Sequence, residues 1–121
     1  MPEKKILVVD DSSTDLKLIS SYLISAGYRV VTATDGEEAL KKVAVEKPDL
    51  VILDIIMPKV NGFDVCRKIK ASETLKGIKV IMVSSKSQES DKFWGMKQGA
   101  DFYMTKPFTS QDLVSNVAKF C

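Results

Sequence analysis

Three carboxylates, a lysine and a serine stand where short apolar, strand-like runs end. They are Asp10 and Asp11, Asp54, Ser84 and Lys106. The run before Asp54 is unbroken, Leu50-Val51-Ile52-Leu53, which is typical of a strand buried on both faces. Since the carboxyl ends of parallel strands meet at one edge of a sheet, these polar groups are expected to form one site. Its chemistry is predicted to be phosphoryl transfer onto Asp54.

The three carboxylates predict a metal site. Converging acids repel one another and hold a proton or a raised pKa unless a cation intervenes. Mg²⁺ prefers oxygen ligands and often binds one or two carboxylates together with phosphate oxygens. We expect Asp11 and Asp54 to ligate it directly, Asp10 through water, and the backbone carbonyl of Ile56 to add an oxygen. The alternative for Asp10 and Asp11 alone is helix capping and dipole stabilisation.

The remaining groups suit a phosphoryl acceptor. A carboxylate such as Asp54 can attack phosphorus and form an acyl phosphate, and Lys106 and Ser84 can then supply a charge and a hydroxyl donor to its oxygens. The alternatives are a solvated loop lysine and an ordinary strand-end serine. The chain has no histidine, which excludes a Ser-His-Asp triad and an imidazole zinc site. Any phosphohistidine must therefore belong to a partner.

Alternating strand-like and helix-like segments position this site. The strands are predicted at Lys5–Asp10, Arg29–Ala33, Leu50–Asp54, Lys79–Ser84 and Asp101–Met104. The helices are predicted at about Ser13–Ser25, after Asp35, after Asn61-Gly62, at about Gln88–Gln98 and after Thr109. Five such units predict an α/β fold with a doubly wound, five-stranded parallel sheet in the order 2-1-3-4-5. Its switch point between strands one and three places a crevice beside the three carboxylates.

Composition narrows the class of protein. With 121 residues the chain is predicted to be one domain, residues 1–121. Its 18 basic and 16 acidic residues give a net charge of +2, which argues against nucleic acid or membrane as a partner. Cys66 and Cys121 are single and far apart, so we expect reduced thiols and a cytoplasmic protein. We expect a monomer.

Several motifs together resemble the receiver domain of two-component response regulators, the CheY-like fold, over essentially the whole chain. They are Val8-Val9-Asp10-Asp11, Asp54-Ile55-Ile56-Met57-Pro58, Asn61-Gly62, Val83-Ser84-Ser85, Gly99-Ala100-Asp101 and Lys106-Pro107-Phe108. The region from Lys86 to Pro107 is most similar to single-domain regulators of twitching motility, the PilH type, which suggests motility or chemotaxis signalling.

The resemblance implies roles for individual residues. Asp54 would be the phosphoacceptor, Asp10 and Asp11 the acidic magnesium residues, Ser84 the switch hydroxyl and Tyr103 the switch aromatic. Lys106 would be the family's lysine. The donor would be a sensor histidine kinase or phosphotransfer protein, and an output protein would dock on the face formed by the fourth helix, fifth strand and fifth helix.

The sequence departs from the family pattern at two positions. Ser84 stands where many relatives have threonine, and Ile56 replaces a polar residue found in the chemotaxis regulator. Because an apolar side chain cannot orient water by hydrogen bonding, we expect slow hydrolysis of the Asp54 phosphate.

The fourth helix carries the candidate partner contact. Phe93 is predicted to face the core, which leaves Trp94 partly exposed as an anchor, or else packed against a neighbouring helix. Gly95 either weakens this helix or makes room for a neighbour.

Other classes of protein fit less well. An aspartyl-phosphate hydrolase needs an acid two residues after its nucleophile, where this chain has Ile56. A flavodoxin-like cofactor binder needs a phosphate loop where Asp10 and Asp11 stand. We therefore predict a signalling protein and not a metabolic enzyme, free-standing or, alternatively, a receiver module excised from a larger regulator or hybrid kinase.

Overall fold

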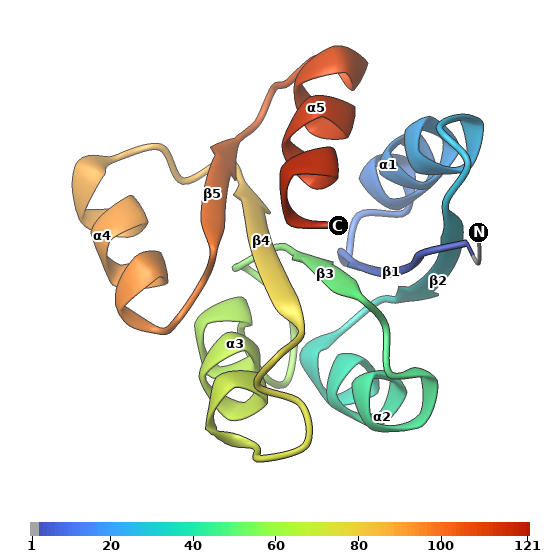
Figure 1. Ribbon diagram of the computed structural model, residues 1–121. Helices are drawn as coiled ribbons and strands as arrows, with labels where there is room; N and C mark the ends of the chain where they lie inside the picture. Colours follow the sequence, from blue (N-terminus) through green and yellow to red (C-terminus); the bar gives the residue numbers. More distant parts are fainter. Residues whose placement is uncertain (1–2) are drawn as a thin grey trace.

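The computed structural model describes residues 3–121, and five strands and five helices alternate along them (Figure 1). The strands are β1 (Lys5–Val9), β2 (Arg29–Ala33), β3 (Leu50–Leu53), β4 (Lys79–Ser84) and β5 (Phe102–Thr105). The helices are α1 (Ser13–Ser25), α2 (Gly36–Glu46), α3 (Gly62–Ala71), α4 (Glu89–Lys97) and α5 (Ser110–Phe120). Met1 and Pro2, which the predicted domain includes, lie outside the described residues.

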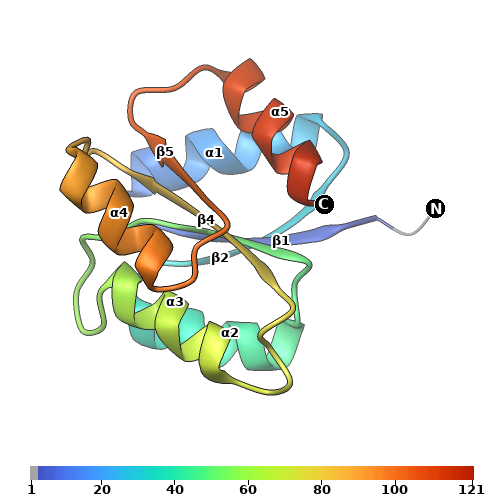
Figure 2. The ribbon, with the colours of Figure 1, turned by 60° about the vertical axis from the view of Figure 1, so that its left-hand side comes forward.

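The strands form one parallel sheet in the order β2-β1-β3-β4-β5, which confirms the predicted topology. Figure 2 shows α1 and α5 on one face of the sheet and α2 and α3 on the other, with α4 beside β5. Central strands covered on both faces bury every side chain, and β3 is buried throughout.

Alternate side chains of the strands enter two separate cores. On one face, Leu7, Val51 and Val80 pack with buried residues of α2 and α3. On the other face, Ile52 and Ile81 pack with buried residues of α1 and α5. Because both cores hold β3 in the middle of the sheet, the residue that follows it has a fixed position.

Polar side chains begin the helices that follow the strands. Ser12 accepts a hydrogen bond from the Asp15 N–H at the start of α1, at 3.3 Å. The N-caps of α2, α3 and α5 are Asp35, Asn61 and Thr109. These caps satisfy N–H groups that lack partners within the helix, and they begin each helix at the edge of the sheet where the strands end. No helix within residues 3–121 is long and apolar enough to cross a membrane.

Candidate functional site

The structure brings the three predicted carboxylates together. Oxygens of Asp10, Asp11 and Asp54 all lie within 4.8 Å of one another. Backbone hydrogen bonds fix two of them: the Asp10 N–H donates to the Ala33 carbonyl at 3.2 Å, and the Asp54 N–H donates to the Val9 carbonyl at 3.0 Å. Asp10 and Asp54 are buried, whereas Asp11 is exposed. The cluster therefore has two rigid acids and one at the solvent edge.

The surroundings of Asp54 are closely packed. The Ile55 N–H donates to its Oδ1 at 2.7 Å. Gly62 begins α3 directly against it, and a Cβ at Gly62 would lie 2.1 Å from the Asp54 carbonyl oxygen. A side chain at position 62 would therefore displace the backbone that carries the carboxylate. Burial raises the pKa of Asp54, Lys106 opposes this rise, and Asp10 adds to it.

The donor set fits a hard divalent cation. Three carboxylates with one solvent-exposed member match the oxygen preference of Mg²⁺ and leave room for its water ligands. Such a cation would favour the charged form of the Asp54 carboxylate, which burial disfavours, as its raised pKa indicates. The Ile56 side chain is 56% exposed. Its backbone carbonyl remains a predicted ligand.

Lys106 reaches into the site from the end of β5. Its Nζ lies 2.8 Å from Asp10 Oδ2, 2.9 Å from Asp15 Oδ2 and 3.7 Å from Asp54 Oδ2. Burial lowers the pKa of Lys106, but the hydrogen bonds it donates to Asp10 and Asp15 outweigh burial, so the pKa is raised and the side chain stays charged. The Lys106 N–H also donates to the Ser84 carbonyl at 2.9 Å, which ties the lysine to the end of β4.

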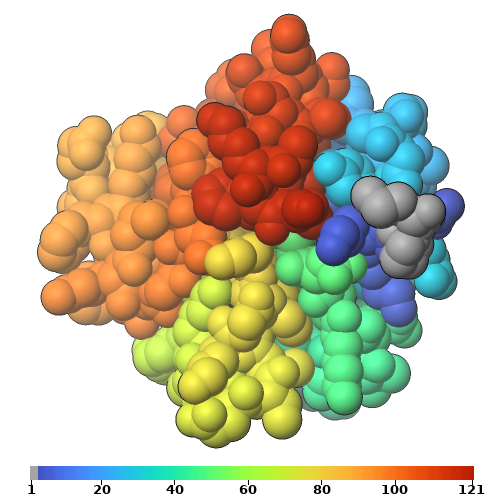
Figure 3. Space-filling view, in the orientation of Figure 1, coloured from blue at the N-terminus to red at the C-terminus, as the bar shows by residue number. Residues whose placement is uncertain are grey.

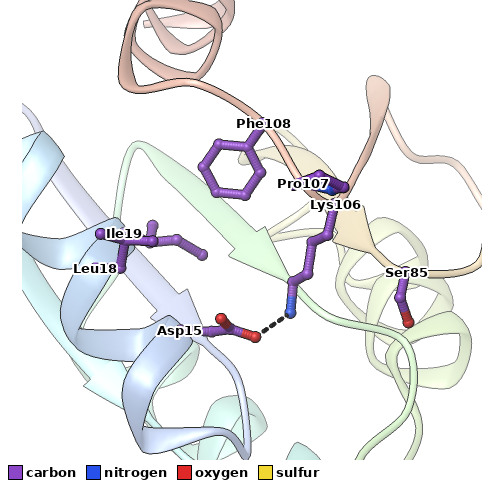
Figure 4. Close-up of a pocket in the computed structure, with 7 residues that line it drawn as sticks. All are labelled: Asp15, Leu18, Ile19, Ser85, Lys106, Pro107 and Phe108. Atoms are coloured by element: carbon purple, nitrogen blue, oxygen red, sulfur yellow. Dashed lines mark hydrogen bonds and ion pairs between the residues drawn. The ribbon is translucent and has the colours of Figure 1, made fainter.

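Asp15 is the site residue that sequence reasoning missed. Its carboxylate accepts one of the two hydrogen bonds that Lys106 Nζ donates to acidic side chains. A sequence signal for it existed, because an acid in the first turn of a helix that follows β1 lies at the same edge of the sheet as Asp10. Asp15 and Lys106 line a hollow of about 410 Å³ together with Leu18 and Phe108. Figure 4 shows these side chains and the contact between Asp15 and Lys106.

Ser84 and Tyr103 lie on neighbouring strands, as expected. Ser84 is fully buried, and its Oγ accepts a hydrogen bond from the Lys86 N–H at 3.3 Å. Tyr103 is buried, and its hydroxyl donates to the Lys86 carbonyl at 2.7 Å. Gly95 makes room for this ring, since a Cβ there would lie 3.0 Å from Tyr103 Cδ2 and 2.9 Å from Met82 Sδ. Of the two alternatives for Gly95, the structure supports the steric one.

The prediction for Phe93 was wrong. Its side chain is 63% exposed, and Trp94 beside it is 51% exposed, as expected for the partner-contact alternative. The buried position of α4 is occupied by Gly95. A glycine carries no hydrophobic signal, so the apolar pattern pointed to the wrong face of the helix. In Figure 3, α4 stands at the left rim of the molecule.

Comparisons with known proteins agree with this architecture. Residues 6–118 match the response regulator receiver domain family. The chain is 45% identical over 114 residues to the alkaline phosphatase synthesis transcriptional regulatory protein PhoP of Bacillus subtilis, covering 94% of this chain and 47% of PhoP. It is 39% identical to protein PilH of Pseudomonas aeruginosa, covering 93% of each. The chain thus spans about half the length of PhoP and nearly all of PilH.

A solved structure extends the agreement to three dimensions. Chemotaxis protein CheY4 of Vibrio cholerae superposes with a TM-score of 0.93 at 31% identity, covering 99% of this chain and 100% of CheY4. The family match over nearly the whole chain, the similarity to PilH and this superposition lead to one conclusion. The chain belongs to the response regulator receiver domain family.

Proposed function

We propose that Asp54 accepts a phosphoryl group from the phosphohistidine of a sensor histidine kinase or a phosphotransfer protein. One observation carries this proposal: three carboxylates within 4.8 Å of one another meet a charged lysine at the carboxyl ends of buried strands, in a receiver domain. In this proposal residues 1–121 form one domain, this domain carries the phosphoacceptor, and the chain acts as a signalling protein.

The transfer requires one bond to form and one to break. An Asp54 carboxylate oxygen attacks phosphorus, and the bond between phosphorus and the partner's histidine nitrogen breaks. The electron pair leaves with the imidazole, which takes up a proton from solvent. Asp10, Asp11 and Asp54, with the carbonyl of Ile56, would hold Mg²⁺, which when bound neutralises charge on the phosphoryl oxygens.

Two side chains then sense the new group. Lys106 already lies 3.7 Å from Asp54 and can donate to a phosphoryl oxygen. The Ser84 hydroxyl, held by Lys86 in this structure, can turn to another. Movement of Ser84 frees the backbone that Tyr103 also binds, so the charge at Asp54 changes the surface made by α4, β5 and α5.

That surface is the proposed docking site for an output protein, with Trp94 as an anchor. The near-neutral net charge of +2 gives no support for nucleic acid as the partner. Free thiols at Cys66 and Cys121 support action in a reducing compartment such as the cytoplasm. The resemblance of the region from Lys86 to Pro107 to single-domain regulators of twitching motility supports a motility pathway. Capture of partners from extracts with and without beryllofluoride and Mg²⁺ would test the output. Identical partners in both states would contradict phosphorylation-dependent output.

The direct test is phosphorylation with phosphoramidate, a small donor that carries a phosphorus–nitrogen bond. We expect a mass gain of one phosphoryl group in Mg²⁺ and none in EDTA or in the Asp54→Asn variant. Asp49→Asn is the matched control, because Asp49 precedes β3, where it accepts a hydrogen bond from the Lys5 N–H, whereas Asp54 follows the strand. Phosphorylation of Asp54→Asn equal to wild type would refute the assignment.

A further inference from the structure

We propose that Asp15 restrains Lys106: its carboxylate competes with the phosphoryl group on Asp54 for the ammonium and so weakens phosphoryl binding. Asp15 would thus be a positioning residue that acts through Lys106. The inference rests on the proposed function of Asp54 and adds a residue that tunes it.

The ammonium of Lys106 lies closer to the carboxylate of Asp15 than to that of Asp54. Lys106 Nζ lies 2.9 Å from Asp15 Oδ2, within hydrogen-bond range, but 3.7 Å from Asp54 Oδ2, outside it. Figure 4 shows the Asp15 carboxylate directed at the ammonium across the hollow between α1 and the loop after β5. The ammonium has three N–H donors, and Asp10 and Asp15 bind two of them, so Asp15 and a phosphoryl oxygen on Asp54 would compete for the position of the ammonium.

The Asp15 carboxylate is not occupied by capping α1. It is the Asp15 backbone N–H that donates to Ser12 Oγ, so the side chain is free to bind the lysine. It is 38% exposed, whereas the Lys106 side chain is 17% exposed. A partly solvated carboxylate loses little when the lysine leaves it, which makes this contact the exchangeable one, while the contact to buried Asp10 persists.

The charge balance gives the direction of the effect. Four carboxylates surround or contact Lys106 and the predicted metal site: Asp10, Asp11, Asp15 and Asp54. Phosphorylation replaces the single charge of Asp54 by a phosphoryl dianion. Asp15 then adds repulsion and also draws the ammonium toward its own carboxylate. Removing its charge is therefore expected to favour the phosphorylated state.

A simpler role for Asp15 is to stabilise α1 through the helix dipole. Asp112 provides the matched control, because it holds the same position in α5. Its N–H donates to the Thr109 hydroxyl at 3.0 Å, three residues after the cap, and its side chain makes no ion pair among residues 3–121. If the dipole is the whole effect, Asp15→Asn and Asp112→Asn will behave alike.

The test is the affinity for beryllofluoride, a tetrahedral mimic of the phosphoryl group, measured by calorimetry in saturating Mg²⁺. We expect Asp15→Asn to bind about three- to tenfold more tightly than wild type, the range set by one charge-assisted contact. Asp15→Ser, which also suits the start of a helix, is expected to do the same. Asp15→Glu, which keeps the carboxylate, and Asp112→Asn are expected to bind as wild type does.

A second readout follows Lys106 itself. In NMR spectra of the ammonium without beryllofluoride, the Lys106 NζH₃ signal is expected to shift in Asp15→Asn and to be unchanged in Asp112→Asn. Unchanged or weaker beryllofluoride binding in both Asp15→Asn and Asp15→Ser would overturn the inference while leaving the phosphoacceptor assignment intact. A wild-type chain that binds no beryllofluoride would overturn both.

Discussion

The hydroxyl groups of Ser84 and Tyr103 bind opposite ends of one residue. Lys86 donates its N–H to Ser84 at 3.3 Å and accepts from Tyr103 through its carbonyl at 2.7 Å. Ser84 is buried at the end of β4, and Tyr103 packs against Gly95 of α4. The end of β4 beside the acidic cluster and the α4 surface are therefore joined through the backbone of Lys86, in the loop between β4 and α4.

Removing one end of this connection should loosen the loop. We expect Tyr103→Phe to lower the free energy of unfolding by about 1 kcal/mol, the net value of one hydrogen bond, and to speed hydrogen exchange in residues 85–88. The measurement is urea unfolding with exchange followed by mass spectrometry. Tyr28→Phe is the control, since the Tyr28 hydroxyl has no hydrogen-bond partner among residues 3–121. Equal exchange in both variants would contradict the connection.

The charge on Asp54 should destabilise the metal-free fold. Because burial raises its pKa above the ordinary value of 3.8, the folded state binds the proton more tightly than the unfolded state does. The unfolding free energy therefore falls as the pH rises from the unfolded-state pKa through the raised folded-state pKa. Asp54→Asn has no carboxylate to ionise at this position, so it does not lose stability in this way as the pH rises. In EDTA we expect it to raise the melting temperature near neutral pH, with a smaller gain toward about pH 4.

Mg²⁺ provides the complementary measurement for Asp54. It should raise the melting temperature of the wild type, because it binds the folded state, and raise that of Asp54→Asn much less. A neutral-pH melting temperature of Asp54→Asn below that of wild type in EDTA would show that the carboxylate charge does not destabilise the fold.

Ile56 should prolong the phosphorylated state. Its side chain is exposed, two residues after Asp54 in the chain, and offers no hydrogen bond to an attacking water. We expect Ile56→Asn to shorten the lifetime of the Asp54 phosphate several-fold, measured as decay after removal of the donor. Ile56→Ala separates hydrogen bonding from bulk: if it shortens the lifetime as much as Ile56→Asn, exclusion of water by size is the cause. An unshortened lifetime in Ile56→Asn would sink the hypothesis.

Trp94 should contribute to output binding and not to phosphorylation. Since its side chain is half exposed, Trp94→Ala should change the free energy of unfolding by less than about 1 kcal/mol. We expect weaker capture of the output partner in beryllofluoride and Mg²⁺, with unchanged phosphorylation by phosphoramidate. Phe93→Ala, at an exposed neighbour on α4, tests whether the effect is specific to Trp94. Partner binding equal to wild type in Trp94→Ala would refute its role as an anchor.

The sheet order and the acidic cluster could be predicted because both follow from chain order. Apolar runs such as the one before Asp54 can be buried only in central strands, and parallel strands bring their carboxyl ends to one edge. Spacing along the chain then suffices to place Asp10, Asp11 and Asp54 together, as the structure confirms.

Two features could not be predicted in this way. The chain order places Asp15 at the same edge of the sheet as Asp10, but its pairing with Lys106 depends on how α1 is rotated and on the side-chain conformation of the lysine. Neither of these leaves a periodic pattern in the sequence. The exposure of Phe93 depends on Tyr103, whose ring occupies the space beside Gly95. Because of this ring, the inner face of α4 has room only for glycine, and Phe93 lies on the outer face. Both are set by contacts between distant segments.

The account depends most on the identity of the phosphorylated atom, which chemical mapping locates directly. The protein is phosphorylated with phosphoramidate in Mg²⁺, reduced with borohydride to convert an acyl phosphate to an alcohol, digested and sequenced by mass spectrometry. We predict reduction at Asp54 alone, abolished by EDTA and by prior treatment with hydroxylamine, which cleaves acyl phosphates. A phosphoryl group found on Ser84 or on another acid, with Asp54 unmodified, would contradict the account.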